Sequence, residues 1–226
     1  LVFLDIEKNF GFPVIVKPVN LGSSVGISKA DSKAKLDDAL SEAFKYSKKV
    51  LVERAITNLT EVNCSVLGDD RSAEASVCER PVNSDEILSY SDKYLGGSKS
   101  SKGMASTRRV IPADISAENT HYIQELAVKA FKALGCCGVA RIDFMIDNDA
   151  NKIYLNEINT IPGSLSFYLW EPKGVKYKEL LDRMIKLALK RERERSSITY
   201  AFDTNVLSGV KLGGTKGAKG SGGAKI

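Results

Sequence analysis

Two short runs of polar side chains on neighbouring predicted strands carry the strongest sign of chemistry. Arg141 and Asp143 lie two residues apart, as do Glu157 and Asn159. Because side chains alternate along a strand, each pair shares one face, and a hairpin can bring both pairs onto one surface. Two carboxylates and an amide oxygen are hard ligands of the kind that Mg²⁺ prefers. The alternative is an ion network of Arg141, Asp143 and Glu157, which would explain Asn159 less well.

A turn rich in glycine and serine follows the first predicted strand, which ends at Lys17. The run Asn20–Gly26 (NLGSSVG) can aim backbone N–H groups and hydroxyls at one point, and Lys17 would add a positive charge. That combination suits a phosphate. The run lacks the spacing of a Walker loop or of a G-x-G-x-x-G loop before a helix, so an ordinary hairpin turn is an equal alternative.

Two glutamates and a Pro-Gly turn complete the candidate residues. Glu53 ends the apolar run VLVE, and a salt bridge with Lys17 is its simplest interpretation. In a nucleotide site, Glu53 would instead accept from the adenine amino group, and Glu61 would hold ribose hydroxyls. The turn at Pro162 and Gly163 frees backbone N–H groups that, with Arg141, would stabilise an oxyanion. An ordinary turn is again the alternative.

The elements that must position these residues alternate between strand and helix. Period-two and period-3.6 patterns predict six strands and three helices. The strands lie near Pro13–Lys17, Val50–Glu53, Val62–Leu67, Ala73–Val77, Val139–Ile146 and Lys152–Ile158, and the helices near Leu36–Phe44, Ile123–Leu134 and Tyr177–Glu194. A turn at Asp147–Asp149 joins the last two strands, and Asp31 or Ser32 can cap the first helix. In the last helix, the residues expected to face inward are Leu180, Leu181, Met184, Ile185 and Ala188. The pattern favours an α+β fold of mostly antiparallel sheets with helices packed on one face.

Composition excludes several classes of protein. Apolar residues make up 43% and charged residues 27% of the 226 residues, which argues against disorder of the whole chain. No apolar run is long enough for a membrane span. The four cysteines form no C-x-x-C pair, as expected of reduced thiols in a cytoplasmic protein. Four of the five net positive charges lie in the last 18 residues, which contain no arginine or aromatic residue, so nucleic acid is not an expected partner.

Five segments, in this order and spacing, resemble the ATP-binding C-terminal portion of D-alanine–D-alanine ligases, a family of the ATP-grasp superfamily. They are GFPVIVKPVNLGSSVGIS, VLVERAITNLTEVNCSVLG, DKYLGG, GVARIDFMI and YLNEINTIPG. The resemblance implies a partial ATP-grasp fold with nucleotide between two lobes. We expect residues 1–68 in the central lobe and 69–200 in the C-terminal lobe, with a lid loop at about 89–106. Residues 201–226 would be a flexible tail, and the N-terminal substrate domain would be absent.

The resemblance also implies roles for individual residues. The nucleotide would contact Lys17, Ser23, Ser24, Val25, Glu53, Arg54, Ile56, Glu61 and Lys93. The catalytic set would be Arg141, Gly163, Ser23 and the lid residue Tyr94. Asp143, Glu157 and Asn159 would bind two Mg²⁺ ions, with Mn²⁺ as an alternative metal. The substrate would contact Arg141, Gly163, Tyr168 and Leu169.

The implied activity is ATP-dependent joining of two D-alanines through an acylphosphate for peptidoglycan precursor synthesis, with release of ADP and phosphate. Such a ligase would be cytoplasmic and would act on small molecules, without a membrane partner. A homodimer is a possible assembly. Lacking the N-terminal domain, the chain alone is expected to be inactive. Tyr168 stands where the family usually has a serine that grips the second substrate. This departure leaves D-serine, D-lactate or another acceptor open, and a non-catalytic nucleotide-binding module is a further alternative.

Overall fold

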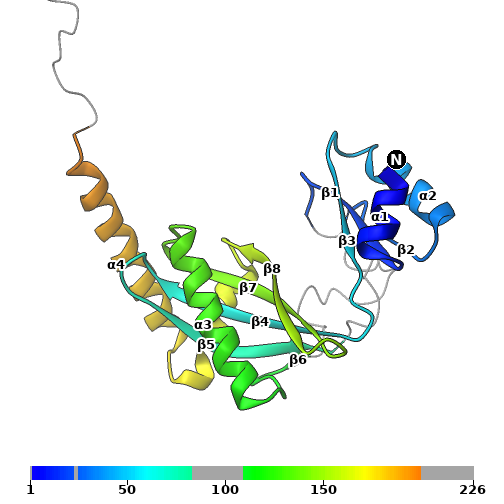
Figure 1. Ribbon diagram of the computed structural model, residues 1–226. Helices are drawn as coiled ribbons and strands as arrows, with labels where there is room; N and C mark the ends of the chain where they lie inside the picture. The colour runs from blue at the N-terminus through cyan, green and yellow to red at the C-terminus, as the bar shows by residue number, and fades with distance from the viewer. Residues whose placement is uncertain (1, 23–24, 83–108, 200–226) are drawn as a thin grey trace, which may run out of the picture.

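The computed structural model describes residues 2–22, 25–82 and 109–199, with side chains from residue 6 onward. Within these ranges the chain forms two antiparallel sheets (Figure 1). The smaller sheet has the strand order β2-β1-β3, and the larger has the order β6-β5-β4-β7-β8. The predicted α+β class with antiparallel sheets is confirmed.

The smaller sheet is built from β1 (Val14–Pro18), β2 (Ser28–Ala30) and β3 (Val50–Arg54). It packs against α1 (Val2–Phe10) and α2 (Lys33–Ala43). Helix α2 begins after Ser32, whose hydroxyl accepts from the backbone N–H of Lys35 and so caps the helix, as expected. The buried side chains of this core are Ile6, Val14, Val16, Ala30, Leu36, Ala39 and Ala43.

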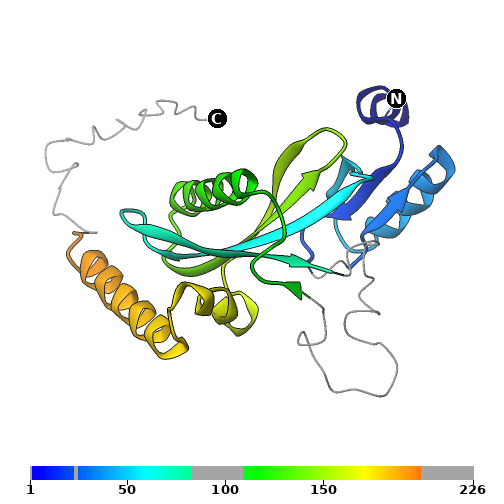
Figure 2. The same ribbon diagram turned by 90° about the horizontal axis from the view of Figure 1, so that it is seen from below.

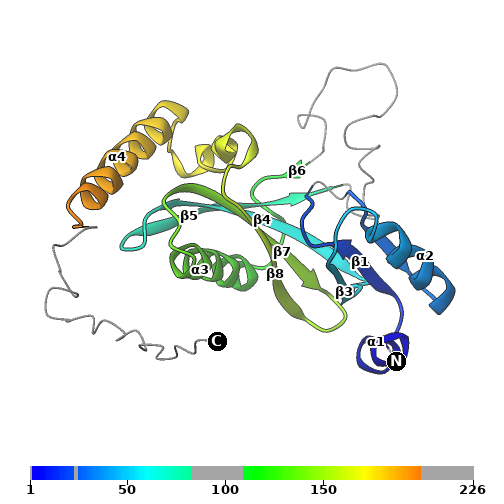
Figure 3. The same cartoon turned by 90° about the horizontal axis from the view of Figure 1, so that it is seen from above.

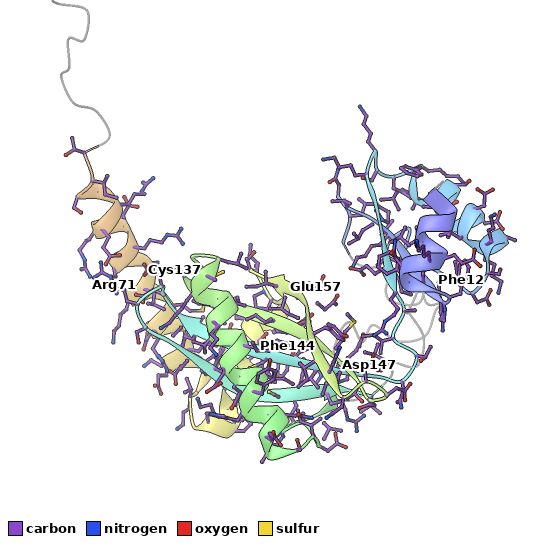
Figure 4. The ribbon with its side chains drawn as sticks, in the orientation of Figure 1. Phe12, Arg71, Cys137, Phe144, Asp147 and Glu157 are labelled. Atoms are coloured by element: carbon purple, nitrogen blue, oxygen red, sulfur yellow. The ribbon has the colours of Figure 1, made fainter. Side chains whose placement is uncertain are left out.

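The larger sheet is built from β4 (Leu59–Gly68), β5 (Ala73–Pro81), β6 (Arg109–Val110), β7 (Gly138–Asp147) and β8 (Lys152–Asn159). Helix α3 (Ala117–Ala133) lies across one face, so that Phe144 of β7 is enclosed between sheet and helix (Figures 2 and 4). The fully buried side chains of this interface include Val62, Cys64, Val66, Ile123, Ala127, Phe131 and Ile142. Alternate residues of β4 and β7 therefore face away from α3.

Among the described residues, only one end of the opposite face is covered. A 3₁₀ segment, η3 (Gly163–Leu169), the short η4 (Glu171–Lys173) and the first part of α4 (Tyr177–Ser196) pack there (Figure 3). Trp170 and Leu180 meet Leu67 and Val139 in a small separate core. Away from this end, the face displays the polar residues of β4, β5, β7 and β8.

The two sheets divide between Arg54 and Leu59, since β4 pairs along its whole length with β7. The expected lobe boundary at residue 68 stays a prediction. The expectation that Ile185 and Ala188 face inward is wrong, because both are exposed, Ile185 to 58%. Helix α4 projects past the end of the sheet (Figure 1), and Leu180 near its start is its one buried residue.

The helix α1 and the short strands β2 and β6 were not predicted. Across the described ranges, no helix is long and apolar enough to cross a membrane.

Candidate active site

The register of the larger sheet gathers polar side chains in one row. Asp143 pairs with Glu157 on one side and with Asn63 on the other, and Asn63 pairs in turn with Glu79. The row therefore crosses β5, β4, β7 and β8 on the face away from α3. A second row contains Arg141, which pairs with Asn159. The predicted hairpin, and the shared face of its two polar pairs, are confirmed.

Arg141 and Asp143 form a bidentate ion pair. The Arg141 Nε and Nη2 atoms each lie 2.7 Å from a different carboxylate oxygen of Asp143. Their side chains are 17% and 14% exposed. Burial opposes the charge of Arg141, yet the bonds to Asp143 hold the arginine pKa above its ordinary value. Burial also raises the pKa of Asp143, aided by the charge of Glu157, while Arg141 acts in the opposite direction.

Glu157 and Asn159 complete an oxygen-rich corner beside this ion pair. Glu157 is exposed at the edge of the sheet (Figure 4), and a register irregularity follows the Asp143–Glu157 pair. Such irregularities often re-aim side chains next to active sites. The Asn159 amide nitrogen donates to Asp143 at 3.0 Å and to Glu157 at 3.4 Å. The amide nitrogen, and not the oxygen, therefore faces the carboxylates.

Asp143, Glu157 and Asn159 could hold Mg²⁺ only if a bound ligand supplied further oxygen atoms. Among the described residues, no three histidine, cysteine or acidic side chains gather as a metal site. Asp143 and Glu157 supply two carboxylates, and Asn159 would add an oxygen if its amide turned over. Mg²⁺ in proteins commonly takes one or two carboxylates and completes its shell with phosphate oxygens and water. These three residues match that pattern and not an all-protein cage.

The chain after β8 turns sharply beside Arg141. Gly163 opens η3, and Ser164, Leu165 and Ser166 have φ values of 53°, 54° and 51°. Consecutive left-handed conformations cost energy in residues other than glycine, and such strain clusters at functional sites. Leu169, which was predicted to touch substrate, has a fully buried side chain. Only its backbone remains for that role.

The row also holds a group that sequence reasoning missed. Glu79 is 3% exposed, and its Oε1 atom accepts from Asn63 Nδ2 at 3.0 Å and from the Tyr168 hydroxyl at 3.1 Å. The Arg109 guanidinium lies 4.5 Å from the centre of the Tyr168 ring and 3.5 Å from Glu79 Oε2. The alternation of the polar residues Glu61, Asn63 and Ser65 along β4 is a sequence signal that could have extended the predicted polar face toward Glu79.

The nucleotide residues predicted on the smaller sheet form an ion pair. Lys17 Nζ lies 2.7 Å from Glu53 Oε2, with side chains 26% and 40% exposed. The salt bridge given above as the simplest interpretation of Glu53 is thus present in the structure. The Asn20–Gly26 run connects the hairpin strands β1 and β2, and the Val25 N–H donates to the Gly22 carbonyl at 3.3 Å. That N–H is therefore used within the turn.

Arg54 and Glu61 lie on either side of the connection between the sheets. Arg54 Nη2 lies 2.9 Å from Asp147 Oδ2, at the end of β7 (Figure 4), so its side chain ties β3 to the larger sheet. Ile56 is half-buried within the connection. Glu61 sits on β4 opposite Met145, on the same face as Asn63. The predicted residues Ser23, Ser24, Lys93 and Tyr94, and the lid loop at about 89–106, lie outside the described residues.

Comparison with known proteins gives a consistent result. The family model described as the C-terminus of D-ala D-ala ligase matches residues 2–186. A D-alanine–D-alanine ligase of Caldicellulosiruptor bescii is 45% identical over 202 residues, which cover 87% of this chain and 52% of that protein. A second, from Acetivibrio thermocellus, is 45% identical over 190 residues, or 82% of this chain and 48% of that protein. The chain thus spans about half the length of these curated relatives.

Solved structures agree with this result. The D-alanine-D-alanine ligase of Coxiella burnetii aligns with a TM-score of 0.69 and 30% identity, over 86% of this chain and 49% of that chain. The VanG D-Ala:D-Ser ligase of Enterococcus faecalis aligns with a TM-score of 0.68 and 36% identity, over 81% of this chain and 52% of that chain.

Proposed function

The chain belongs to the family of D-alanine–D-alanine ligases, and on that premise we propose that it forms the ATP-binding and catalytic part of a ligase that joins two D-alanines. The proposed reaction activates the carboxylate of one D-alanine with the γ-phosphate of ATP. The amine of the second then attacks the acylphosphate, and ADP and phosphate are released. Such an enzyme would act in the cytoplasm to supply the dipeptide for peptidoglycan precursors.

The observation that carries this proposal is the cluster at the end of the β7–β8 hairpin. The Arg141–Asp143 pair lies opposite Asn159 and Glu157, and the chain turns at Gly163 four residues after Asn159. Cations and N–H groups held in place can stabilise charge that develops in a transition state. Arg141, oriented by Asp143, and the Gly163 N–H would act in this way on the oxyanion of the tetrahedral intermediate.

Asp143, Glu157 and Asn159 would hold Mg²⁺ together with the phosphates of ATP. When bound, the ion would neutralise negative charge on those phosphates. The chain's own residues would supply the geometry. Glu157 is reachable from solvent at the sheet edge, whereas Asp143 is fixed by Arg141.

Lys17 and Glu53 would serve the nucleotide from the smaller sheet. Both side chains are partly exposed, and their ion pair is the kind that contributes little to stability. Opening it would let Lys17 contact phosphate and Glu53 accept from the adenine amino group. The smaller sheet would then contact both the adenine and a phosphate, and the larger sheet would hold the phosphates through Mg²⁺.

A ligase with D-serine as its second substrate is the other candidate. The similarity to a D-Ala:D-Ser ligase at 36% identity favours it, and so does Tyr168, which stands where a serine is usual. The larger number of relatives named D-alanine–D-alanine ligase keeps D-alanine as the first choice.

Phosphate release from ATP tests the proposal. The complete ligase, with this chain as its C-terminal part, is assayed with Mg²⁺ and D-alanine, with L-alanine as the matched control. D-Alanine-dependent release, with formation of the dipeptide, is expected. Release with D-alanine only when D-serine is added would select the second candidate, and no release with any amino acid would refute both.

A further inference from the structure

Glu79 is a buried carboxylate that the proposed chemistry does not use. Its Oε1 atom accepts two hydrogen bonds, from Asn63 and Tyr168. Its Oε2 atom is buried and has no hydrogen-bond partner among the described residues, with the Arg109 guanidinium at 3.5 Å as its nearest cation. Removing a carboxylate from water is costly unless it is paired and hydrogen-bonded. A carboxylate kept in this position therefore calls for an explanation.

Tyr168 is held from two sides. Its hydroxyl donates to Glu79, so the single O–H proton of the phenol is already engaged. The Arg109 guanidinium lies 4.5 Å from the ring centre, within the range of a cation–π contact. Burial and the nearby Glu79 charge raise the pKa of Tyr168, which keeps the phenol protonated as a donor. The ring is thereby fixed in orientation.

The cluster lies next to the proposed catalytic residues. Glu79 pairs with Asn63, which pairs with Asp143, so Glu79 and Asp143 are two strand spacings apart, about 10 Å. Tyr168 lies in η3, the segment that Gly163 begins. An acceptor amino acid that reached Arg141 and the Gly163 N–H would therefore meet the Tyr168 ring.

We propose that Glu79 is a positioning residue, whose buried carboxylate fixes Tyr168 so that its ring forms a rigid wall of the acceptor site. This inference rests on the proposed function, which puts the acceptor beside Gly163. Glu79 does not touch the reacting atoms. It acts through Tyr168, and the Tyr168 hydroxyl contributes by anchoring the ring and not by gripping the substrate.

Steady-state kinetics of the active ligase test whether Glu79 shapes the acceptor site through Tyr168. Glu79→Ala removes the acceptor of the Tyr168 bond, and we expect the KM for the second amino acid to rise about tenfold with the KM for ATP unchanged. Glu79→Gln keeps an oxygen for Tyr168 and Asn63, so its constants should stay within about threefold of wild type. Asp69→Asn, which changes another buried carboxylate paired to a cation at the far end of the sheet, is the matched control.

A fluorescence measurement tests the same idea without substrate. Trp170 is the sole tryptophan of the sequence, is fully buried, and follows η3 directly. If Glu79 fixes this segment, acrylamide should quench Trp170 about twice as strongly in Glu79→Ala as in Glu79→Gln, Asp69→Asn or wild type.

The two measurements separate the inference from its premise. If the wild-type ligase shows no turnover dependent on a D-amino acid, the proposed function fails, and the quenching of Trp170 still decides whether Glu79 positions η3. Equal quenching in Glu79→Ala and wild type would overturn the inference. So would an unchanged acceptor KM in Glu79→Ala of an active ligase.

Discussion

Arg141 and Asp143, two residues apart on one strand, are joined by parallel hydrogen bonds of 2.7 Å from Nε and Nη2 to the two carboxylate oxygens. A bidentate pair fixes the plane of the guanidinium as well as its position. Asp143 also lies opposite Glu157 in the sheet. One carboxylate therefore orients the cation and faces the second carboxylate, which links the two halves of the proposed catalytic cluster.

Glu157→Gln should abolish most of the activity and leave the fold intact. The change removes one of the two charges proposed to hold Mg²⁺, and loss of such a ligand should lower kcat by about 100-fold or more. Because Glu157 is exposed, the midpoint of thermal unfolding should shift little. Phosphate release and a thermal melt measure the two effects. Glu179→Gln, an exposed glutamate of α4, is the control, and full turnover in Glu157→Gln would rule out the metal assignment.

Arg141→Lys should also lower activity, although it conserves the charge. Lysine presents one ammonium group and cannot make the two parallel bonds to Asp143, so the cation would lose its fixed orientation. We expect kcat to fall about 10- to 100-fold with the KM for ATP nearly unchanged. Single-turnover phosphate release would show the slowed chemical step. A lysine variant as fast as wild type would mean that positive charge alone suffices at this position.

The hairpin and its two polar pairs could be predicted because they depend on period-two alternation, which is local. The strand pattern and the Asp147–Asp149 turn were enough to predict that Asp143 and Glu157 lie opposite each other. Helix α2 likewise followed from apolar spacing and the cap at Ser32. In these elements, local propensity and tertiary packing agree.

Glu79 could not be found in this way. It lies next to Arg80 and two residues before Pro81, a run that is typical of a solvated strand end. Its burial follows from pairing with Asn63 and from the return of the chain to it at Tyr168, 89 residues later.

The prediction for Ile185 failed for a different reason. Met184 and Leu187 pack with Leu180 against the small core, so α4 still contacts the core beyond Ile185. Ile185 is exposed because it lies on another face of the helix, and the apolar pattern alone did not show which face meets the core.

Lys17→Met and Glu53→Gln should each weaken ATP binding without unfolding the protein. The two residues form a partly exposed ion pair, so its loss should cost at most about 1 kcal/mol of the free energy of unfolding. If the pair opens to contact phosphate and adenine, each variant should raise the KM for ATP about tenfold. Lys35→Met, which breaks the exposed Lys35–Asp31 pair on the same part of the chain, is the control. An unchanged KM for ATP in both variants would leave a structural salt bridge as their whole role.

Asp69→Asn should destabilise the protein in a pH-dependent manner without affecting turnover. Lys190 donates to the Asp69 carboxylate at 2.5 Å, and together with the backbone N–H groups of Ser72 and Arg71 it lowers the pKa of Asp69 from 3.8 to about 2. Because the folded-state pKa is lowered, the stabilisation is fully present above about pH 4 and is lost as the pH falls through about 2. At pH 7 the variant should lose about 1 kcal/mol of the free energy of unfolding, a figure kept small because Lys190 is partly exposed.

Urea unfolding at pH 7 and at about pH 2.5 should therefore show a difference in stability between wild type and variant that becomes smaller at the lower pH. A difference of the same size at both pH values would mean that the Asp69 charge does not contribute, and that the loss comes from the turn geometry alone.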